Sequence, residues 1–280
     1  MNAPRSPRLL ALITVLGFGY GLLYLPIAVL SVYSFNASAR VAVWGGFSLR
    51  WYQALAENPQ IIDAALLSLR IAAISATVAT GLGALAALAL RRGRRLSGRT
   101  GLRAMLLAPL VMPDIIIGIS LLLLFPWLNQ SFGWPLRGAT TITIAHITFS
   151  VAYVSVVVTA RLAGIDPALN DAATDLGAPP AAVFFAITLA LMAPGLAAGW
   201  LLAFTLSLDD LVIASFVSGP GASTLPMVVF SMVRLGISPE INALSTLLII
   251  LVGVLLGAAM LLLKKKLPVN RGSPVSSRRR

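Results

Sequence analysis

Three aspartates lie within long apolar stretches of this sequence, where charged side chains are rare. Asp114, Asp209 and Asp210 each interrupt a run of aliphatic residues. A carboxylate at bilayer depth costs about 2.5–3.5 kcal/mol on insertion scales, so it is a functional candidate by default. Carboxylates offset the lost hydration of ammonium groups, and a ring such as that of Trp200 adds a cation–π contact. These residues predict a path for a di- or polycation; the alternative is that the carboxylates pair with Ser, Thr or Arg70 and only hold the helices together.

His146 is the single histidine of the chain and lies in another apolar run. A lone intramembrane histidine more often donates a hydrogen bond to a carbonyl or hydroxyl, here with Thr143 and Thr148 near in sequence, than it relays protons. The chain has no cysteine, and its acidic residues are scattered over different apolar runs. The sequence therefore predicts no metal site and no catalytic constellation, which disfavours an intramembrane enzyme.

The segments that must position these side chains are apolar and long. The chain of 280 residues is 58% hydrophobic and 11% charged, whereas soluble domains carry roughly 25% charged residues. Apolar runs of this length predict membrane-spanning helices, and the first run, of about 27 residues, exceeds the apolar core of a cleaved signal peptide. We expect one all-α membrane domain, residues 9–265, with six transmembrane helices at about Leu9–Phe35, Ile61–Leu90, Ala104–Leu128, Thr140–Ala160, Ala193–Val217 and Ile241–Leu263.

The basic residues are distributed asymmetrically about these six runs. The net charge is +12, and most Lys and Arg residues fall before the first run, between the second and third, at the end of the fourth or after the sixth. The positive-inside rule then places both termini in the cytoplasm, with residues 1–8 as a short N-terminal segment and 266–280 as a disordered basic tail. Because membrane insertion accounts for this charge, no nucleic-acid partner is predicted.

Residues 166–190 form a small acidic segment between the fourth and fifth runs. Asp166 followed by Pro167 predicts a helix start, and Gly177 predicts its end in a left-handed conformation. The double proline after Ala178 predicts the start of a second helix, which carries Phe184 and Phe185. A shallow, alanine-rich face suits close approach to another protein, although a loop folded against its own bundle remains the alternative. The residues on that face are Leu169, Ala172, Ala173 and Leu176.

The stretch DAATDLGAPPAAVFFAITLALMAP resembles the cytoplasmic signature of permease subunits of ATP-binding-cassette importers. That signature reads glutamate-alanine-alanine, three residues, glycine, and later isoleucine-x-leucine-proline. This sequence departs from it twice, with Asp171 in place of the glutamate and Ala190 in place of the proline. The resemblance implies a coupling segment, residues 166–190, that docks onto an ATPase through Asp171, Ala172, Ala173, Leu176, Gly177 and Phe184.

Further blocks are similar to polyamine permeases, among them GWLLAFTLSLDDLVIASFVSGPGASTLPMVVF. The similarity to the putrescine type is greater than the similarity to the spermidine type. This resemblance implies the type I importer permease (MetI-like) fold in a bacterial inner membrane. It also implies two ATP-binding subunits carrying ATP and Mg, a second, homologous permease subunit and a periplasmic polyamine-binding protein. Importers of another cationic or small organic solute share the same docking segment and stay an alternative.

The chain itself lacks the means to hydrolyse ATP. A phosphate-binding P-loop needs the pattern G-x-x-x-x-G-K-[ST], and the lysines of this chain are confined to Lys264, Lys265 and Lys266 at the end of the last apolar run. No cofactor is therefore expected on this chain. A stand-alone, ion-coupled secondary transporter is the rival of another class; inverted repeats would favour it, and the sequence displays none.

Overall fold

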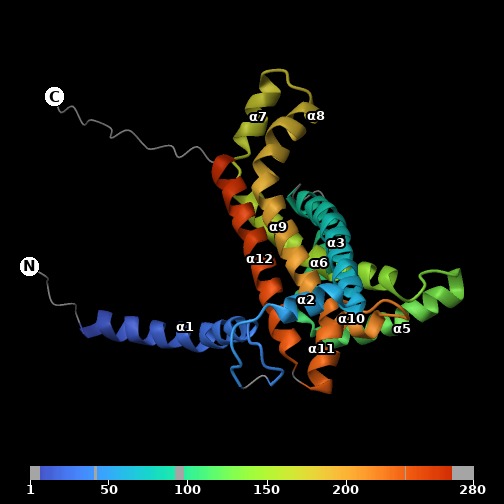
Figure 1. The fold of residues 1–280 in the computed structure, drawn as a ribbon. Helices are drawn as coiled ribbons and strands as arrows, with labels where there is room; N and C mark the ends of the chain where they lie inside the picture. Colours follow the sequence, from blue (N-terminus) through green and yellow to red (C-terminus); the bar gives the residue numbers. More distant parts are fainter. Residues whose placement is uncertain (1–6, 41–42, 92–97, 237, 267–280) are drawn as a thin grey trace, which may run out of the picture.

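The computed structural model describes residues 7–40, 43–91, 98–236 and 238–266 and is helical nearly throughout (Figure 1). Three predicted segments lie wholly or partly outside these ranges: the tail beyond Lys266, most of the N-terminal segment, and residues 92–97 of the basic stretch between the second and third predicted runs. The elements in order are α1 (Pro7–Tyr33), α2 (Arg50–Glu57), α3 (Pro59–Arg91), α4 (Arg99–Val111), α5 (Asp114–Phe132), α6 (Ala139–Ala163), α7 (Ala168–Asp175), α8 (Pro180–Val183), a π-helical turn η2 (Phe184–Thr188), α9 (Leu189–Asp209), α10 (Val212–Val217), α11 (Leu225–Leu235) and α12 (Pro239–Lys266).

Long apolar helices dominate the described part of the chain, as the sequence predicts. Five described stretches are long and apolar enough to cross a membrane: Ala11–Tyr33, Pro59–Arg91, Asp114–Phe132, Ala139–Ala163 and Pro180–Asp209. The sixth predicted run corresponds to α12, whose described apolar part, Pro239–Val254, is shorter than these five. The all-α fold class is therefore confirmed, while six spans stay a prediction.

The third predicted run, Ala104–Leu128, is wrong as a single helix. α4 ends at Val111, Met112 is extended with ψ of 136°, and α5 begins at Asp114. Pro113 explains the break, because a proline disfavours helical geometry in the residue before it and lacks the N–H that would continue the helix. Asp114 therefore lies in the first turn of a new helix rather than in the middle of a long one.

The fifth predicted run, Ala193–Val217, is also interrupted. α9 ends at Asp209, Asp210 is extended with ψ of 120°, and the short α10 follows. At its other end the helix extends further than predicted, since α8, η2 and α9 follow one another without a gap from Pro180 to Asp209. The acidic pair thus lies at a helix terminus, where its two side chains take different environments.

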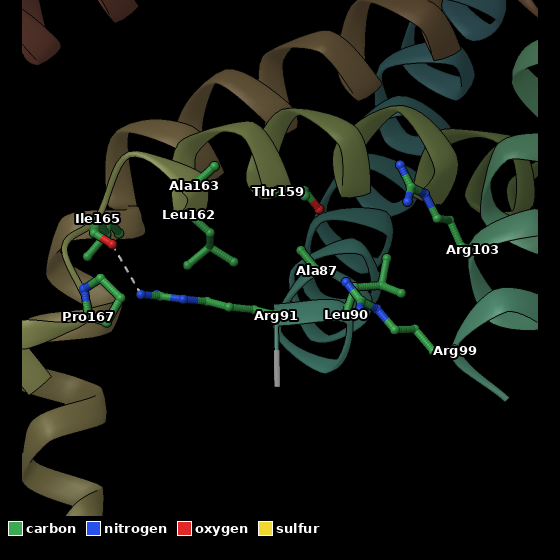
Figure 2. Close-up of a pocket in the computed structure, with 10 residues that line it drawn as sticks. All are labelled: Ala87, Leu90, Arg91, Arg99, Arg103, Thr159, Leu162, Ala163, Ile165 and Pro167. Carbon is green, nitrogen blue, oxygen red and sulfur yellow. Dashed lines mark hydrogen bonds between the residues drawn. The ribbon is translucent and has the colours of Figure 1, made fainter. Parts of the chain in front are cut away.

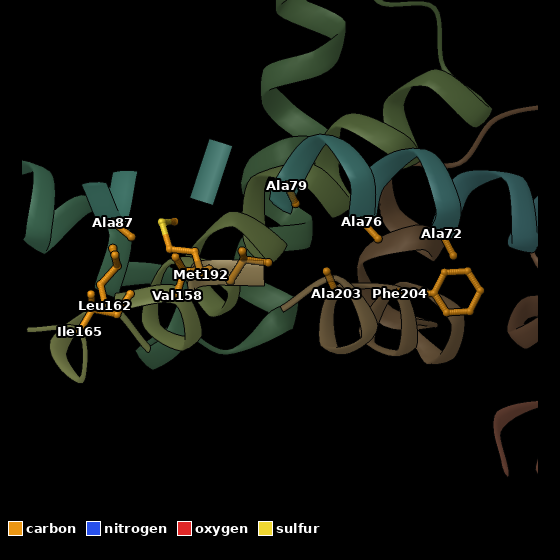
Figure 3. Close-up of a cluster of buried hydrophobic side chains, with 11 residues drawn as sticks. Ala72, Ala76, Ala79, Ala87, Val158, Leu162, Ile165, Met192, Ala203 and Phe204 are labelled. Atoms are coloured by element: carbon orange, nitrogen blue, oxygen red, sulfur yellow. The ribbon is translucent and has the colours of Figure 1, made fainter. Parts of the chain in front are cut away.

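The centre of the bundle is the contact between α3, α6 and α9. Figure 3 shows the side chains that meet there, and they are small on α3 and larger on α6 and α9. A Cβ at Gly83 of α3 would lie 2.7 Å from Val154 Cγ1 of α6, and one at Gly199 of α9 would lie 3.2 Å from the same atom. Small residues let helix backbones approach closely, which is the usual basis of helix packing in membranes.

The remaining helices surround this core. A second cluster joins α5 and α10 to α3 and α6, and a third joins α2, α11 and α12 to the start of α3. α1 packs against α12 and otherwise reaches away from the bundle (Figure 1). Its apolar residues Ala11–Tyr33 are not buried inside this chain.

Candidate functional site

The three predicted aspartates lie in the region where α9 ends and where α10 adjoins α5. Asp209 ends α9, Asp210 follows it, and Asp114 begins α5. Asp114 and Asp210 both lie within range to interact electrostatically with the Asp209 carboxylate. The contact of α5 with α10 is close because Gly118 leaves room for the Phe216 ring against its backbone. That Asp114 and one of the Asp209/Asp210 pair line a path for a cation stays a prediction.

Asp210 is buried and belongs to a chain of polar side chains that crosses the bundle. Its Oδ2 lies 3.1 Å from His146 Nε2, and the two side chains are 8% and 1% exposed. His146 Nδ1 lies 2.6 Å from Ser207 Oγ, and the Ser75 hydroxyl donates to Ser207 at 3.2 Å. α3, α6 and α9 are thus connected to Asp210 through hydrogen bonds in a low-dielectric interior, where such networks are strong when every member is satisfied.

The Asp210 carboxylate also caps α10. Its oxygens accept the backbone N–H groups of Ile213 at 3.2 Å and Ala214 at 2.7 Å. At the other end of α10, Arg137 donates to the Phe216 carbonyl and Thr141 to the Val217 carbonyl. α10 is therefore fixed at both termini, and the position of Asp210 is set by the helix that it caps.

Asp209 has a different environment from its neighbour. It is exposed and lines a cavity of about 390 Å³ between α9, α11 and α12. Apart from this carboxylate and the Thr205 hydroxyl, the lining is apolar: Leu208, Leu225, Pro226, Val229, Leu248 and Val252. An apolar wall with one exposed carboxylate suits an ammonium group attached to a methylene chain.

Trp200 does not join the acidic cluster. Its indole N–H donates to Thr77 Oγ1 at 3.1 Å, and its ring stacks on Phe204 with centroids 5.0 Å apart. Ten residues of helix separate Trp200 from Asp210, which corresponds to about 15 Å. The predicted contact of Trp200 with the same cation stays a prediction.

The predicted docking segment is a helical hairpin that extends beyond the end of the bundle, at the top of Figure 1. Asp166 Oδ1 accepts the N–H of Ala168 at 2.9 Å, as expected of a capping residue. α7 ends in a Schellman motif: Gly177 has φ of 84°, and the N–H groups of Gly177 and Ala178 donate to Thr174 and Ala173 carbonyls. The helix start and stop that the sequence predicts are both confirmed.

The hairpin presents apolar side chains to its surroundings. Leu176 is 89% exposed and Phe185 is 66% exposed, although both are large and apolar. Asp171 and Ala172 are exposed, whereas Ala173 is partly buried. Phe184, which we expect to dock, is half-buried and packs edge-on against Phe185 with centroids 5.2 Å apart. Phe185 is therefore the more accessible ring of the pair.

Hydrogen bonds join the hairpin to the bundle at its base. Thr188 donates to the Asn170 side chain at 3.3 Å, which links η2 to α7. Arg161, at the end of α6, donates to the Leu191 carbonyl at 2.9 Å. Arg91, at the end of α3, donates to the Ile165 carbonyl at 3.3 Å. The three core helices therefore all reach the base of the segment that projects from them.

The comparisons with known proteins define the class of this membrane protein. Residues 79–267 match the family described as binding-protein-dependent transport system inner membrane component, and the chain belongs to this family. It is 55% identical over 243 residues, 86% of each chain, to the putrescine transport system permease protein PotI of Escherichia coli K12. It is 43% identical to the spermidine/putrescine permease PotC of the same strain, over 90% of this chain and 94% of that one.

Solved structures with the same fold are also transporters. A bacterial ABC transporter that imports alginate matches over 92% of this chain and 94% of its own, with a TM-score of 0.68 and 16% identity. The methionine transporter MetNI matches over 74% of this chain and 96% of its own, with a TM-score of 0.62 and 16% identity. These likenesses show the fold of ABC importer permeases for this chain.

Proposed function

We propose that this chain is the permease subunit of an ATP-driven importer for putrescine or a related polyamine. Its family and its similarity to putrescine and spermidine/putrescine permeases support this assignment. The observation that carries the substrate class is the cluster of Asp114, Asp209 and Asp210 at the end of α9. Three carboxylates at one place in an apolar bundle favour a substrate that carries more than one positive charge, because each charge can be compensated there.

We infer six transmembrane helices with both termini in the cytoplasm. α12, with 28 residues, is long enough for the sixth span at about 1.5 Å per residue. The basic residues then gather on the side of the docking hairpin, as the positive-inside rule requires. On this topology the hairpin is cytoplasmic and the aspartates lie toward the opposite side of the membrane.

The proposed complex contains two ATP-binding subunits, a second permease subunit and a periplasmic polyamine-binding protein. ATP and Mg reside on the ATP-binding subunits, and this chain holds neither. ATP binding closes the ATPase dimer, which moves the α7–α8 hairpin and switches the bundle from an inward- to an outward-open state. A ligand shifts such an equilibrium only by its differential affinity for the two states, so nucleotide favours one state and the loaded binding protein favours the same one.

Asp209 and Asp210 have separate roles in this proposal. Asp209 is exposed beside an apolar cavity and contacts the ammonium group directly. Asp210 is hydrogen-bonded to His146 and to α10, so it contributes its negative charge from a fixed position. His146 then keeps Asp210 in place and does not relay protons.

Reconstituted transport tests the substrate assignment. The complete complex in proteoliposomes, with binding protein and ATP, is expected to accumulate labelled putrescine and to stop when either ATP or the binding protein is omitted. Arginine and methionine serve as control solutes of other charge patterns. Accumulation of a control solute in place of putrescine would contradict the polyamine assignment, and uptake by this chain alone under an ion gradient would establish a secondary transporter.

Cysteine cross-linking tests the docking segment separately, because the chain has no native cysteine. Leu176→Cys, at an 89% exposed position of the hairpin, is expected to cross-link to the ATP-binding subunit in a nucleotide-dependent manner. Leu235→Cys, 91% exposed at the end of α11, is the matched control and is expected to give no such product. Equal products from both positions, or none from an assembled complex, would overturn the docking assignment.

A further inference from the structure

A pocket lined by three arginines lies at the base of the docking hairpin. Its volume is about 420 Å³, and it is enclosed by the end of α3, the start of α4 and the end of α6 (Figure 2). Arg91 comes from α3, and Arg99 and Arg103 come from α4. The other lining residues are Ala87, Leu90, Thr159, Leu162, Ala163, Ile165 and Pro167.

The positive charge of this pocket is not neutralised by the described part of the chain. Arg91 donates to the Ile165 carbonyl, which is uncharged, and within the described residues no carboxylate lies within salt-bridge distance of these three arginines. Asp166, the acidic residue next to the lining in sequence, uses its carboxylate to cap α7 at Ala168. Arg99 is also the first residue of α4, where the helix dipole disfavours a cation. An anion in the pocket would relieve this unfavourable arrangement.

The pocket also has an apolar wall, which narrows the kind of anion that fits. Leu90, Leu162 and Ile165 contribute aliphatic side chains beside the guanidinium groups. The pocket lies where the helices end, which is the depth of the headgroup region when the bundle spans a membrane. Guanidinium groups bind phosphate oxygens in a bidentate manner, and basic pockets between helices on the cytoplasmic side bind anionic lipid headgroups. A phosphodiester joined to acyl chains satisfies both the arginines and the apolar wall, whereas free phosphate satisfies only the arginines.

We propose that this pocket binds the phosphate of an anionic phospholipid from the cytoplasmic leaflet. The orientation rests on the topology under the proposed function. The bound headgroup joins α3, α4 and α6 next to Pro167, at the point from which the α7–α8 hairpin projects. The lipid therefore holds the base of the docking segment in a fixed position relative to the core helices.

Native mass spectrometry of the complete, delipidated complex tests the proposal directly. Phosphatidylglycerol is added back, and the retained fraction is compared between the native chain and an Arg99→Gln/Arg103→Gln double variant. Within the described residues neither arginine side chain has a recorded hydrogen-bond partner, so glutamine orphans no acceptor. Arg234→Gln is the control, since Arg234 is an exposed arginine on α11 whose guanidinium lies over the Phe230 ring. The Arg99→Lys/Arg103→Lys double variant keeps both charges. Its lipid retention is measured as well, so that the proposal stays testable if the glutamine variant does not assemble.

The expected result is a loss of phosphatidylglycerol retention on the order of tenfold or more in the glutamine variant, substantial retention in the lysine variant and no change in the control. Retention unaffected by the glutamine variant would overturn the proposal, as would displacement of the lipid by millimolar inorganic phosphate, which would make free phosphate the ligand. Dissociation of the ATP-binding subunit with lipid retention unchanged would show that the arginines contact protein. Because this measurement involves no transport, it is independent of the putrescine uptake assay.

Discussion

His146 Nε2 lies 3.1 Å from Asp210 Oδ2 in the interior of the bundle, where α6 meets the end of α9. The other ring nitrogen is engaged by Ser207 at 2.6 Å. Both nitrogens of this histidine therefore have fixed partners within one chain, which is the arrangement of a residue that positions a carboxylate. The alternative role, a proton relay, requires that the hydrogen-bonded chain formed by Asp210, His146, Ser207 and Ser75 carries a proton during transport, which the pH dependence of uptake tests.

Replacement of His146 separates these two roles. His146→Leu removes one hydrogen bond from Asp210, which keeps the N–H groups of Ile213 and Ala214, and one from Ser207, which keeps the Ser75 hydroxyl. A lost hydrogen bond costs about 0.5–1.5 kcal/mol, or about 1.5–3 kcal/mol when one partner is charged. We expect a clear fall in the thermal unfolding midpoint of the detergent-solubilised complex. His146→Gln retains a donor and an acceptor and is expected to lose less stability. Uptake by the glutamine variant should keep the native dependence on pH, and an altered pH profile would instead support a relay.

Charge removal at the acidic pair is expected to have two distinct effects. Asp209→Asn removes an exposed charge, worth about 0.2–1 kcal/mol in an ion pair, so putrescine uptake should fall a few-fold at unchanged membrane abundance. Asp210→Asn disturbs hydrogen bonds to a buried carboxylate, each worth about 1.5–3 kcal/mol, and should reduce both uptake and thermal stability. The measurement is initial uptake rate normalised to membrane abundance, and native rates in both variants would exclude the acidic cluster from the path.

A glycine-to-alanine substitution that strains only the backbone tests the docking hairpin without changing its surface chemistry. Gly177 has φ of 84° with open space around the position of a Cβ, so Gly177→Ala strains only the backbone, by about 1–2 kcal/mol. We expect weaker coupling of ATP hydrolysis to uptake. Gly133→Ala is the matched control, since Gly133 has φ of 71°, equally open space and a place at the end of α5. Equal loss of coupling in both variants would indicate a general loss of stability.

The close contact of α3 with α6 gives a matched pair on one helix. Gly83→Ala places a methyl group 2.7 Å from Val154 Cγ1, whereas Gly81→Ala meets nothing within 4 Å. Overpacking of this kind costs about 1–3 kcal/mol, so the unfolding midpoint should fall for Gly83→Ala and stay near native for Gly81→Ala. Val154→Ala in the Gly83→Ala background should restore part of the loss. Similar midpoints for the two glycine variants would contradict the packing described here.

Features determined by neighbouring residues are predictable from the sequence. The predicted Ile61–Leu90 and Thr140–Ala160 correspond closely to α3 and α6, because apolar length alone determines them. The end of α7 follows from Gly177, which takes the left-handed conformation at little cost. The break before α5 also has a local signal, because the residue before Pro113 avoids helical geometry. The aliphatic residues on both sides of Pro113 nevertheless favour the prediction of one continuous helix.

Features determined by distant residues are not predictable in this way. Thr143 and Thr148, the expected partners of His146, donate to carbonyls of their own helix. The actual partners, Ser207 and Asp210, are 61 and 64 residues away along the chain. The break at Asp210 likewise has no proline or glycine to announce it, and Asp210 there caps the helix that follows. The sequence indicates this break only by a carboxylate within an aliphatic run. Such a carboxylate identifies a candidate site but does not determine its geometry.

The uninterrupted helix from Pro180 to Asp209 spans 30 residues, or about 45 Å. The docking hairpin adjoins its first residue, and the acidic cluster begins at its last. Under the proposed function, movement of the hairpin would be transmitted to the carboxylates along this continuous helix, past the close contacts of Val154 with Gly83 and Gly199. On that proposal, one helix would carry the work of the ATP-binding subunit from one membrane face to the cation at the other.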